Sequence, residues 1–142
     1  MIKFRAWDKE NGIYLYDVQR AYDMMSGLVK YNDGEYAVYD EVCFGDFLNN
    51  KRRYDVEQFT GLKDVNGKEI YEGDILATSS MMYGNEVTDY LKVEWREDYA
   101  GFYCGEKPLY ACLSEWDNDI KFAQTYPEIV GNVHTNPELL KG

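Results

Sequence analysis

The sequence predicts a mainly β protein built on a small SH3-like, partly open β-barrel, with an N-terminal β-hairpin region and a short C-terminal helical turn. Aromatic residues make up 16% of the 142 residues, among them 14 tyrosines, and aromatic side chains favour strands. Short apolar stretches alternate with Gly, Asn and Asp turn signals. A chain of this length folds without a disulfide or a metal. We therefore expect one domain over residues 1–142, with sub-regions at 1–54 and 55–142.

The first expected element is a hairpin at the N-terminus. Apolar and charged residues alternate over residues 2–6, and residues 13–16 form the returning strand. Between them lie Asn11 and Gly12, a pair that tolerates the positive φ of a hairpin turn. The N-terminal strand is therefore paired early in the chain.

The region between this hairpin and residue 54 is less regular. Residues 18–28 carry only a weak pattern, whereas residues 35–40 form a strand candidate that follows a turn. A shorter apolar stretch occupies residues 42–48. We expect no further domain boundary here.

The central segment predicts three strands joined by two tight turns. The strands are expected at residues 56–59, 68–71 and 75–77, and the turns at residues 64–67 and 72–74. A strand-turn-strand-turn-strand path of this kind is typical of small barrels.

The rest of the chain predicts further strands and a C-terminal helical turn. Residues 79–86 are expected to form a variable loop, because Ser and Gly-Asn breakers surround an isolated apolar group. Strand candidates follow at residues 90–95, 101–104, 109–113 and 128–134. Pro137 stands at the first position of the expected helical turn.

The charge balance argues against nucleic acid as a direct partner. The chain has 15 basic and 26 acidic residues, a formal net charge of −11, whereas proteins that bind nucleic acid neutralise phosphates with Lys and Arg. An acidic surface also disfavours anionic membranes. The one basic cluster is predicted to be a solvated turn, and consists of Lys51, Arg52 and Arg53.

Targeting signals and cysteine usage point to the cytoplasm. The N-terminus alternates apolar and charged residues without the apolar core of a signal peptide, and no window has the length of a membrane span. Cys43, Cys104 and Cys112 are an odd number with no CxxC spacing, which favours reduced, buried thiols.

Three groups of residues, in this order along the chain, carry a resemblance to a known family. One is the N-terminal stretch around Trp7, and a second covers residues 58–75. The third lies near the C-terminus. The motif residues that we take as candidate binding positions are Trp7, Gly61, Asp64, Asn66, Gly67, Glu72, Gly73, Asp74, Gly131, Asn132, Asn136 and Pro137.

Together these motifs resemble the YopX family of phage and prophage proteins and span nearly the whole chain. The resemblance implies a largely β fold that contains a barrel, an origin in a phage or prophage, a bacterial host cytoplasm and self-assembly. It implies no established biochemical activity.

No catalytic signature is present. Residues 61–68 are one residue longer than a phosphate-binding loop, and Glu69 stands where such a loop needs Ser or Thr. A calcium loop would need an oxygen ligand at Leu62. His134 is the only histidine, so a metal site rich in histidine is excluded, and we expect a structural role for it.

One carboxylate cluster remains as an enzyme hypothesis. Asp64, Glu72 and Asp74 come from two neighbouring turns and can converge at one end of a barrel to hold a divalent cation. The competing interpretation is structural, because Asp shapes turns by accepting hydrogen bonds from its own backbone. We favour the structural interpretation and expect no cofactor.

Three classes of function follow. The preferred one is a non-enzymatic accessory protein that assembles with itself and binds a host or phage protein, since Trp and Tyr are frequent in binding hot spots. The second is an acidic decoy that inhibits a host DNA-binding enzyme. The third is a metal-dependent hydrolase that uses the turn carboxylates. The aromatic residues behind the first class include Trp7, Trp95 and Trp116.

Overall fold

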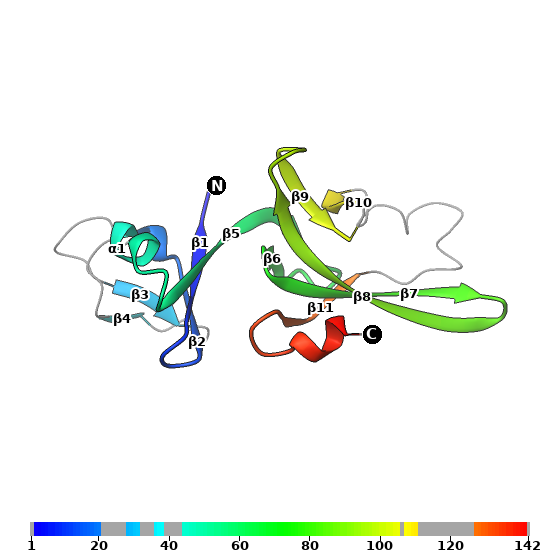
Figure 1. Cartoon of the computed structure of the whole chain (residues 1–142). Helices are drawn as coiled ribbons and strands as arrows, with labels where there is room; N and C mark the ends of the chain where they lie inside the picture. The colour runs from blue at the N-terminus through cyan, green and yellow to red at the C-terminus, as the bar shows by residue number, and fades with distance from the viewer. Residues whose placement is uncertain are drawn as a thin grey trace. The chain divides into compact units, whose positions relative to one another are not determined.

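In the computed structural model the chain forms two compact units, Met1–Phe59 and Thr60–Gly142 (Figure 1). The boundary falls inside a strand, a few residues after position 54, where we expected the N-terminal sub-region to end. Antiparallel strands dominate both units, which confirms the mainly β fold class. The structure describes residues 2–20, 28–31, 36–38, 44–105, 107–110 and 127–141.

In the first unit, the strands follow the order β4-β3-β2-β1-β5. The predicted N-terminal hairpin is confirmed, with Trp7 opposite Tyr14 in its register. The short apolar stretch predicted at residues 42–48 is helical from Phe44 onward. The elements of this unit are β1 (Phe4–Asp8), β2 (Ile13–Tyr16), η1 (Val18–Arg20), β3 (Leu28–Tyr31), β4 (Tyr36–Val38), α1 (Phe44–Asn49) and the start of β5 (Tyr54–Lys63).

The core of the first unit lies on one face of its sheet. On each of the strands β1 and β2, every second residue points to that face, as the two-residue period of a strand requires. The rings of Phe47 and Tyr54 pack with their centroids 4.7 Å apart and bring α1 onto the sheet. The fully buried side chains are those of Ala6, Leu15, Val18, Phe47 and Tyr54.

The alternate positions of the same strands carry a buried ion pair. Arg5 Nε donates to Glu57 Oε1 at 2.9 Å, and the Tyr14 hydroxyl donates to the same oxygen at 2.9 Å. The Arg5 guanidinium also lies 4.0 Å from the centroid of the Tyr14 ring. Both charges are thus satisfied by partners on neighbouring strands, as buried charges require.

Arg53 closes the N-terminal hairpin through Asp8. The Asp8 side chain is fully buried, and its two oxygens each accept a hydrogen bond from the Arg53 guanidinium at 3.1 Å. The Glu10 amide donates to the same carboxylate at 3.0 Å. Residues 51–53 form a turn as predicted, and Lys51 and Arg52 are exposed in it. The prediction that the turn is solvated is wrong for Arg53, whose guanidinium is bonded to Asp8.

In the second unit, a five-stranded sheet has the order β10-β9-β8-β7-β11, and β6 lies next to β5. The long strand β8 pairs with β7 through residues 85–92 and with β9 through residues 93–96, so the sheet curls into a half-barrel. The elements are β6 (Glu69–Tyr71), β7 (Asp74–Met82), β8 (Asn85–Arg96), β9 (Gly101–Cys104), β10 (Lys107–Pro108), β11 (Glu128–Asn132) and η4 (Pro137–Leu140). Its core contains Ile70, Leu76, Val93, Cys104 and Leu109.

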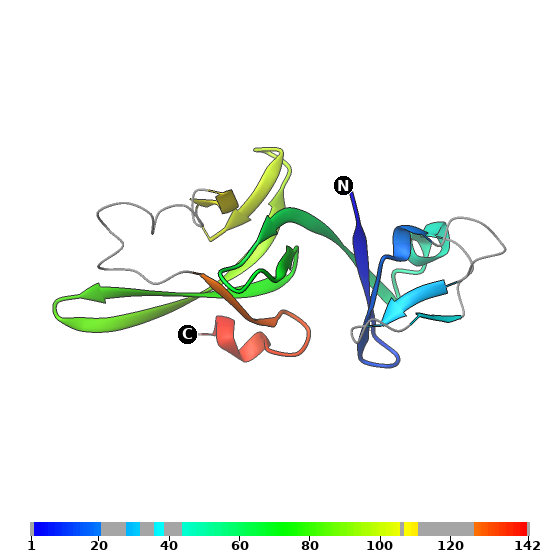
Figure 2. The ribbon, with the colours of Figure 1, turned by 180° about the vertical axis from the view of Figure 1, so that it is seen from behind.

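The outer parts of β7 and β8 form a two-stranded ribbon that extends away from the rest of the second unit (Figures 1 and 2). We predicted a loop at residues 79–86, and this prediction is wrong. Tyr83 and Gly84 both have positive φ, 53° and 81°, which is the geometry of a type I′ hairpin turn. This turn matches the twist of the strands, so pairing continues up to Met82 and Asn85 despite the serines.

Other predictions concern short segments or single residues, and the structure tests some of them. The strand at residues 101–104 is confirmed, whereas Leu109 and Tyr110 are helical rather than extended. Cys104 is a buried free thiol, as expected. Predictions that involve Cys43, Cys112 and Trp116 lie outside the described residues. No helix in the described part of the chain has the length and hydropathy of a membrane span.

Candidate functional site

Asp64 organises the turn between β5 and β6. One of its carboxylate oxygens accepts hydrogen bonds from the backbone N–H groups of Asn66 and Lys68, both at 2.9 Å. The other oxygen accepts the N–H of Ile129 at 2.9 Å, which joins the turn to β11. The expectation that Asp64 shapes its own turn is confirmed, and both of its oxygens have protein partners.

The second turn of the motif holds three strands together. Asp74 is buried, and its Oδ2 accepts the N–H of Tyr71 at 2.8 Å across the turn. The Gly73 N–H donates to the Val93 carbonyl on β8 at 2.8 Å. The Gly73 carbonyl accepts the N–H of Val133 at 2.9 Å, after β11. Asp74 and Gly73 therefore act as structural residues of the half-barrel.

The C-terminal motif forms an interlocked loop after β11. Asn132 Oδ1 accepts the N–H groups of His134 and Thr135, each at 3.0 Å. Asn136 Oδ1 accepts the Asn132 N–H at 3.3 Å and the Thr135 hydroxyl at 2.8 Å. The two asparagine side chains thus satisfy the backbone of the loop, and His134 lies within it.

Gly131 and Pro137 stand at the two ends of this loop. A Cβ atom at Gly131 would lie only 2.4 Å from Asn136 Oδ1, so the Asn136 side chain needs glycine at this position. Pro137 is at the start of η4, which confirms the predicted helical turn. The asparagine before it makes no side-chain cap to η4, because its oxygen is directed back to the loop.

The structure does not assemble a metal centre from these turns. Among the residues that the structure describes, no three His, Cys, Asp or Glu side chains lie together in a way that holds a metal ion. Asp64, Glu72 and Asp74 therefore do not converge. Gly61 lies inside β5 and Gly67 at the end of the Asp64 turn, and neither contributes a polar side chain.

A different cluster lies at the end of the β8–β9 hairpin. We call it the aromatic tip, and it consists of Trp95, Arg96, Tyr99, Phe102 and Tyr103. Trp95 and Phe102 are opposite each other in the register, with ring centroids 5.1 Å apart at 71°. Phe102 packs against the core of the second unit, whereas Trp95 is 43% exposed.

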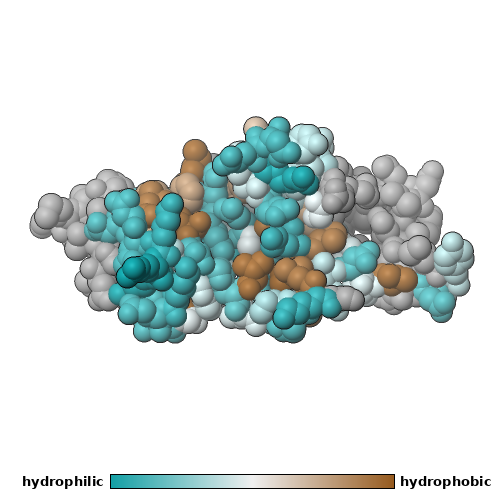
Figure 3. Space-filling model, viewed as in Figure 1, coloured by the Kyte–Doolittle hydropathy of each residue, from teal (hydrophilic) through white to brown (hydrophobic). Residues whose placement is uncertain are grey.

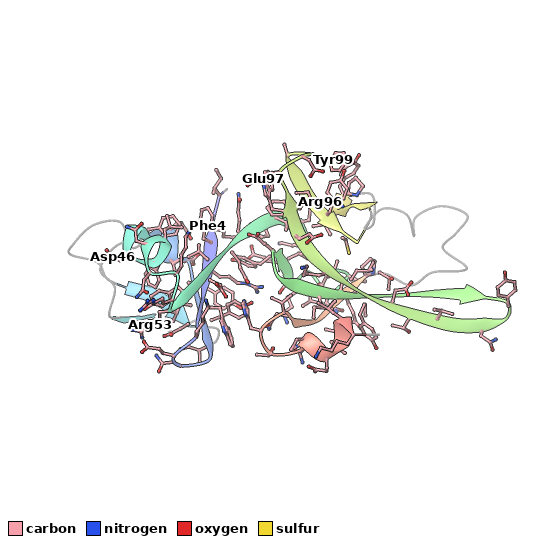
Figure 4. The ribbon with its side chains drawn as sticks, in the orientation of Figure 1. Phe4, Asp46, Arg53, Arg96, Glu97 and Tyr99 are labelled. Atoms are coloured by element: carbon pink, nitrogen blue, oxygen red, sulfur yellow. The ribbon has the colours of Figure 1, made fainter. Side chains whose placement is uncertain are left out.

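The other face of the aromatic tip carries a guanidinium group on two tyrosine rings. The Arg96 guanidinium carbon lies 5.5 Å from the Tyr99 centroid and 5.1 Å from the Tyr103 centroid. The two rings stack with a centroid separation of 5.2 Å and an angle of 28°. Figure 4 shows Arg96, Glu97 and Tyr99 together at the end of this hairpin. Tyr99 is 62% exposed.

The turn of the hairpin holds Tyr99 in place. The Tyr99 N–H donates to the Arg96 carbonyl at 3.3 Å, and the Ala100 N–H donates to the Glu97 carbonyl at 3.2 Å. In Figure 3 the end of this hairpin is mainly teal and pale, because charged residues are strongly hydrophilic on this scale and Tyr and Trp only slightly so. The aromatic tip therefore offers large flat rings on a regular, hydrogen-bonded hairpin.

A family model described as YopX protein matches residues 3–141 of this chain. The chain belongs to the YopX family. It is also similar to the crystal structure of protein EF1440 from Enterococcus faecalis, with 26% sequence identity and a TM-score of 0.58, over 99% of this chain and 98% of that one. Comparison with curated proteins gives no match.

The YopX motifs and the aromatic tip are thus separate features of this chain. The motif residues lie in turns and at the ends of strands, whereas Trp7 lies within β1, where its ring meets Tyr14 edge-on at 4.9 Å. Only Trp95 of the aromatic tip was considered from the sequence. The available signal was alternation, because Trp95 and Phe102 share one face of the hairpin while Arg96 and Tyr103 share the other.

Proposed function

We propose that this YopX-family chain is a non-enzymatic protein-interaction module of a phage or prophage, which binds a host or phage protein and also assembles with itself. The observation that carries the proposal is the exposure of Trp95 and Tyr99 at the aromatic tip, 43% and 62%. Trp, Tyr and Arg are the residue types most enriched in binding hot spots. A rigid hairpin that presents all three loses little conformational entropy on binding.

Self-assembly is supported by a second feature, the edge of β7. In the described part of the chain, β11 pairs with β7 only as far as Ala77, while β7 itself continues to Met82. A strand edge without a neighbour is a template for pairing with another chain. We therefore propose residues 78–82 for the self-contact and the aromatic tip for the partner contact.

Site-specific photocrosslinking tests the partner contact. A photoreactive amino acid replaces Tyr99 in one sample and Tyr83 in another, both in bacteria that carry the phage. Tyr83 is the matched control, because it is a tyrosine in a hairpin turn of the same unit and is 97% exposed. A defined adduct with another protein from position 99 alone supports the partner contact. Position 83 adjoins residues 78–82, so an adduct there between two copies of the chain belongs to the self-contact. The same foreign protein attached equally at both positions, or none at position 99, contradicts the partner contact.

Light scattering after size exclusion tests self-assembly. A stable multiple of 16.6 kDa at micromolar concentration is the expected result. A monomer over the whole concentration range would remove the self-assembly half of the proposal and leave the partner contact as it stands.

A further inference from the structure

We propose that the aromatic tip binds an arginine-rich, cationic segment of a partner protein. The inference rests on the proposed function and adds the chemical class of the partner. It is carried by three observations, which are the guanidinium contacts within the tip, the carboxylates around it and the distribution of charge between the two units.

The tip already binds a guanidinium group of its own. Arg96 lies about equally far from the rings of Tyr99 and Tyr103, at 5.5 and 5.1 Å. The face of an aromatic ring is electron-rich and attracts a cation within about 6 Å of its centroid. Tyr99 is 62% exposed, so much of its surface remains available to a second cation. Trp95, the ring type that binds cations best, is 43% exposed on the other face.

Three carboxylates lie on the same hairpin as these rings. They belong to Glu94, Glu97 and Asp98, and the Asp98 side chain is 66% exposed. Arg96 Nε is 4.0 Å from Asp98 Oδ1 and Lys92 Nζ is 3.5 Å from Glu94 Oε2. Glu97 has no ion-pair partner among the described residues. An incoming cation that stacks on a ring therefore meets a carboxylate close by.

The charge of the chain is concentrated on the unit that carries the tip. Residues 60–142 have 15 Asp and Glu against 7 Lys and Arg, a net charge of −8, whereas residues 1–59 have 11 against 8, a net charge of −3. A second copy would bring the same negative charge to the tip, and a nucleic acid or an anionic membrane would bring phosphates. Only a basic protein segment is attracted both by the aromatic rings and by the negative charge of this unit.

The geometry favours arginine over lysine. A guanidinium group is planar and weakly hydrated, so it stacks on an aromatic ring and still donates to a carboxylate beside it. The ammonium group of lysine is a compact, strongly hydrated charge and gains less from a flat ring. Preference for arginine therefore separates binding at the tip from general attraction to an acidic protein.

Calorimetric titration of the full chain tests the inference with three matched peptides, in which Arg, Lys or Glu alternates with Gly and Ser. The Arg peptide is expected to bind tightest and to lose affinity with salt. Tyr99→Ala should weaken it about two- to fivefold, in proportion to one exposed cation–π contact. Tyr99→Phe keeps the ring and should keep the affinity, while Glu97→Gln should weaken binding and reduce its salt dependence. Tyr83→Ala is the control and should change nothing.

Each alternative result overturns the inference. Equal affinity for the Arg and Lys peptides, an unchanged affinity in Tyr99→Ala, or an equal loss in Tyr83→Ala shows that the tip does not select a guanidinium. Competition at the tip by an oligonucleotide or by a second copy of the chain also excludes a cationic partner. If one of these results is found together with a protein adduct at position 99, the proposed protein-interaction function stands. Only the inference that the partner segment is rich in arginine is then rejected.

Discussion

Replacement of Gly131 by alanine is expected to destabilise the second unit strongly, because the new methyl group has no space. A Cβ atom there would lie 2.4 Å from Asn136 Oδ1, 2.6 Å from its Cγ and 2.8 Å from its Cβ. The backbone fixes both the new Cβ at position 131 and the Cβ of Asn136. A rotamer change of Asn136 therefore leaves the 2.8 Å clash between these two atoms in place. Strain of this kind costs about 1–3 kcal/mol.

The loss of hydrogen bonds adds to that strain. If Asn136 moves away, its Oδ1 gives up the Asn132 N–H at 3.3 Å and the Thr135 hydroxyl at 2.8 Å. Each such bond contributes about 0.5–1.5 kcal/mol. We therefore expect Gly131→Ala to lower the free energy of unfolding by about 2–6 kcal/mol.

Urea unfolding of four proteins measures this coupling. Asn136→Gly removes the clashing Cβ along with the amide, so the double variant Gly131→Ala/Asn136→Gly should be more stable than the sum of the single variants predicts, by about 1–3 kcal/mol. Circular dichroism and tryptophan fluorescence together resolve the transition of the second unit. A loss below about 0.5 kcal/mol in Gly131→Ala, or strict additivity in the double variant, would refute the packing explanation.

Three further substitutions test other contacts by the same unfolding assay. Arg53→Met removes a cationic partner of the buried Asp8 carboxylate and should cost about 3 kcal/mol, and a cost near zero would contradict the buried ion pair. Asp64→Asn turns one acceptor into a donor that faces the N–H of Ile129 or of the turn, with an expected loss of about 1–3 kcal/mol that hydrogen exchange at Ile129 should also report. Tyr83→Asn should stabilise the ribbon by about 0.5–1 kcal/mol, because Asn tolerates positive φ better, and a lower melting temperature would contradict the type I′ turn.

Local chemistry made part of the fold predictable from the sequence. The Asp64 turn and the hairpin turn at Asn11 and Gly12 are set by residues within a few positions of one another. The start of η4 at Pro137 follows from a fixed φ and a missing N–H. In each case a residue type has few conformations open to it, and the neighbouring sequence is sufficient to choose among them.

Contacts between distant positions set the features that the sequence did not reveal. Arg53 and Asp8 are 45 positions apart, and nothing near Arg53 indicates a buried carboxylate. Residues 79–82 have the composition of a loop, yet pairing with β8 makes them a strand. The aromatic tip depends on the register that places Trp95 opposite Phe102. Propensity is a weak guide wherever long-range pairing decides the backbone.

The path of β5 limits how this protein can be divided. The strand runs without interruption from Tyr54 to Lys63, and the boundary between the two units falls between Phe59 and Thr60, within it. Tolerated cuts and insertions concentrate in exposed loops rather than in paired strands. Separate expression of the two halves would leave each with a severed strand end. The two units are therefore expected to be inherited and engineered together, and a workable split would keep residues 54–63 with both pieces.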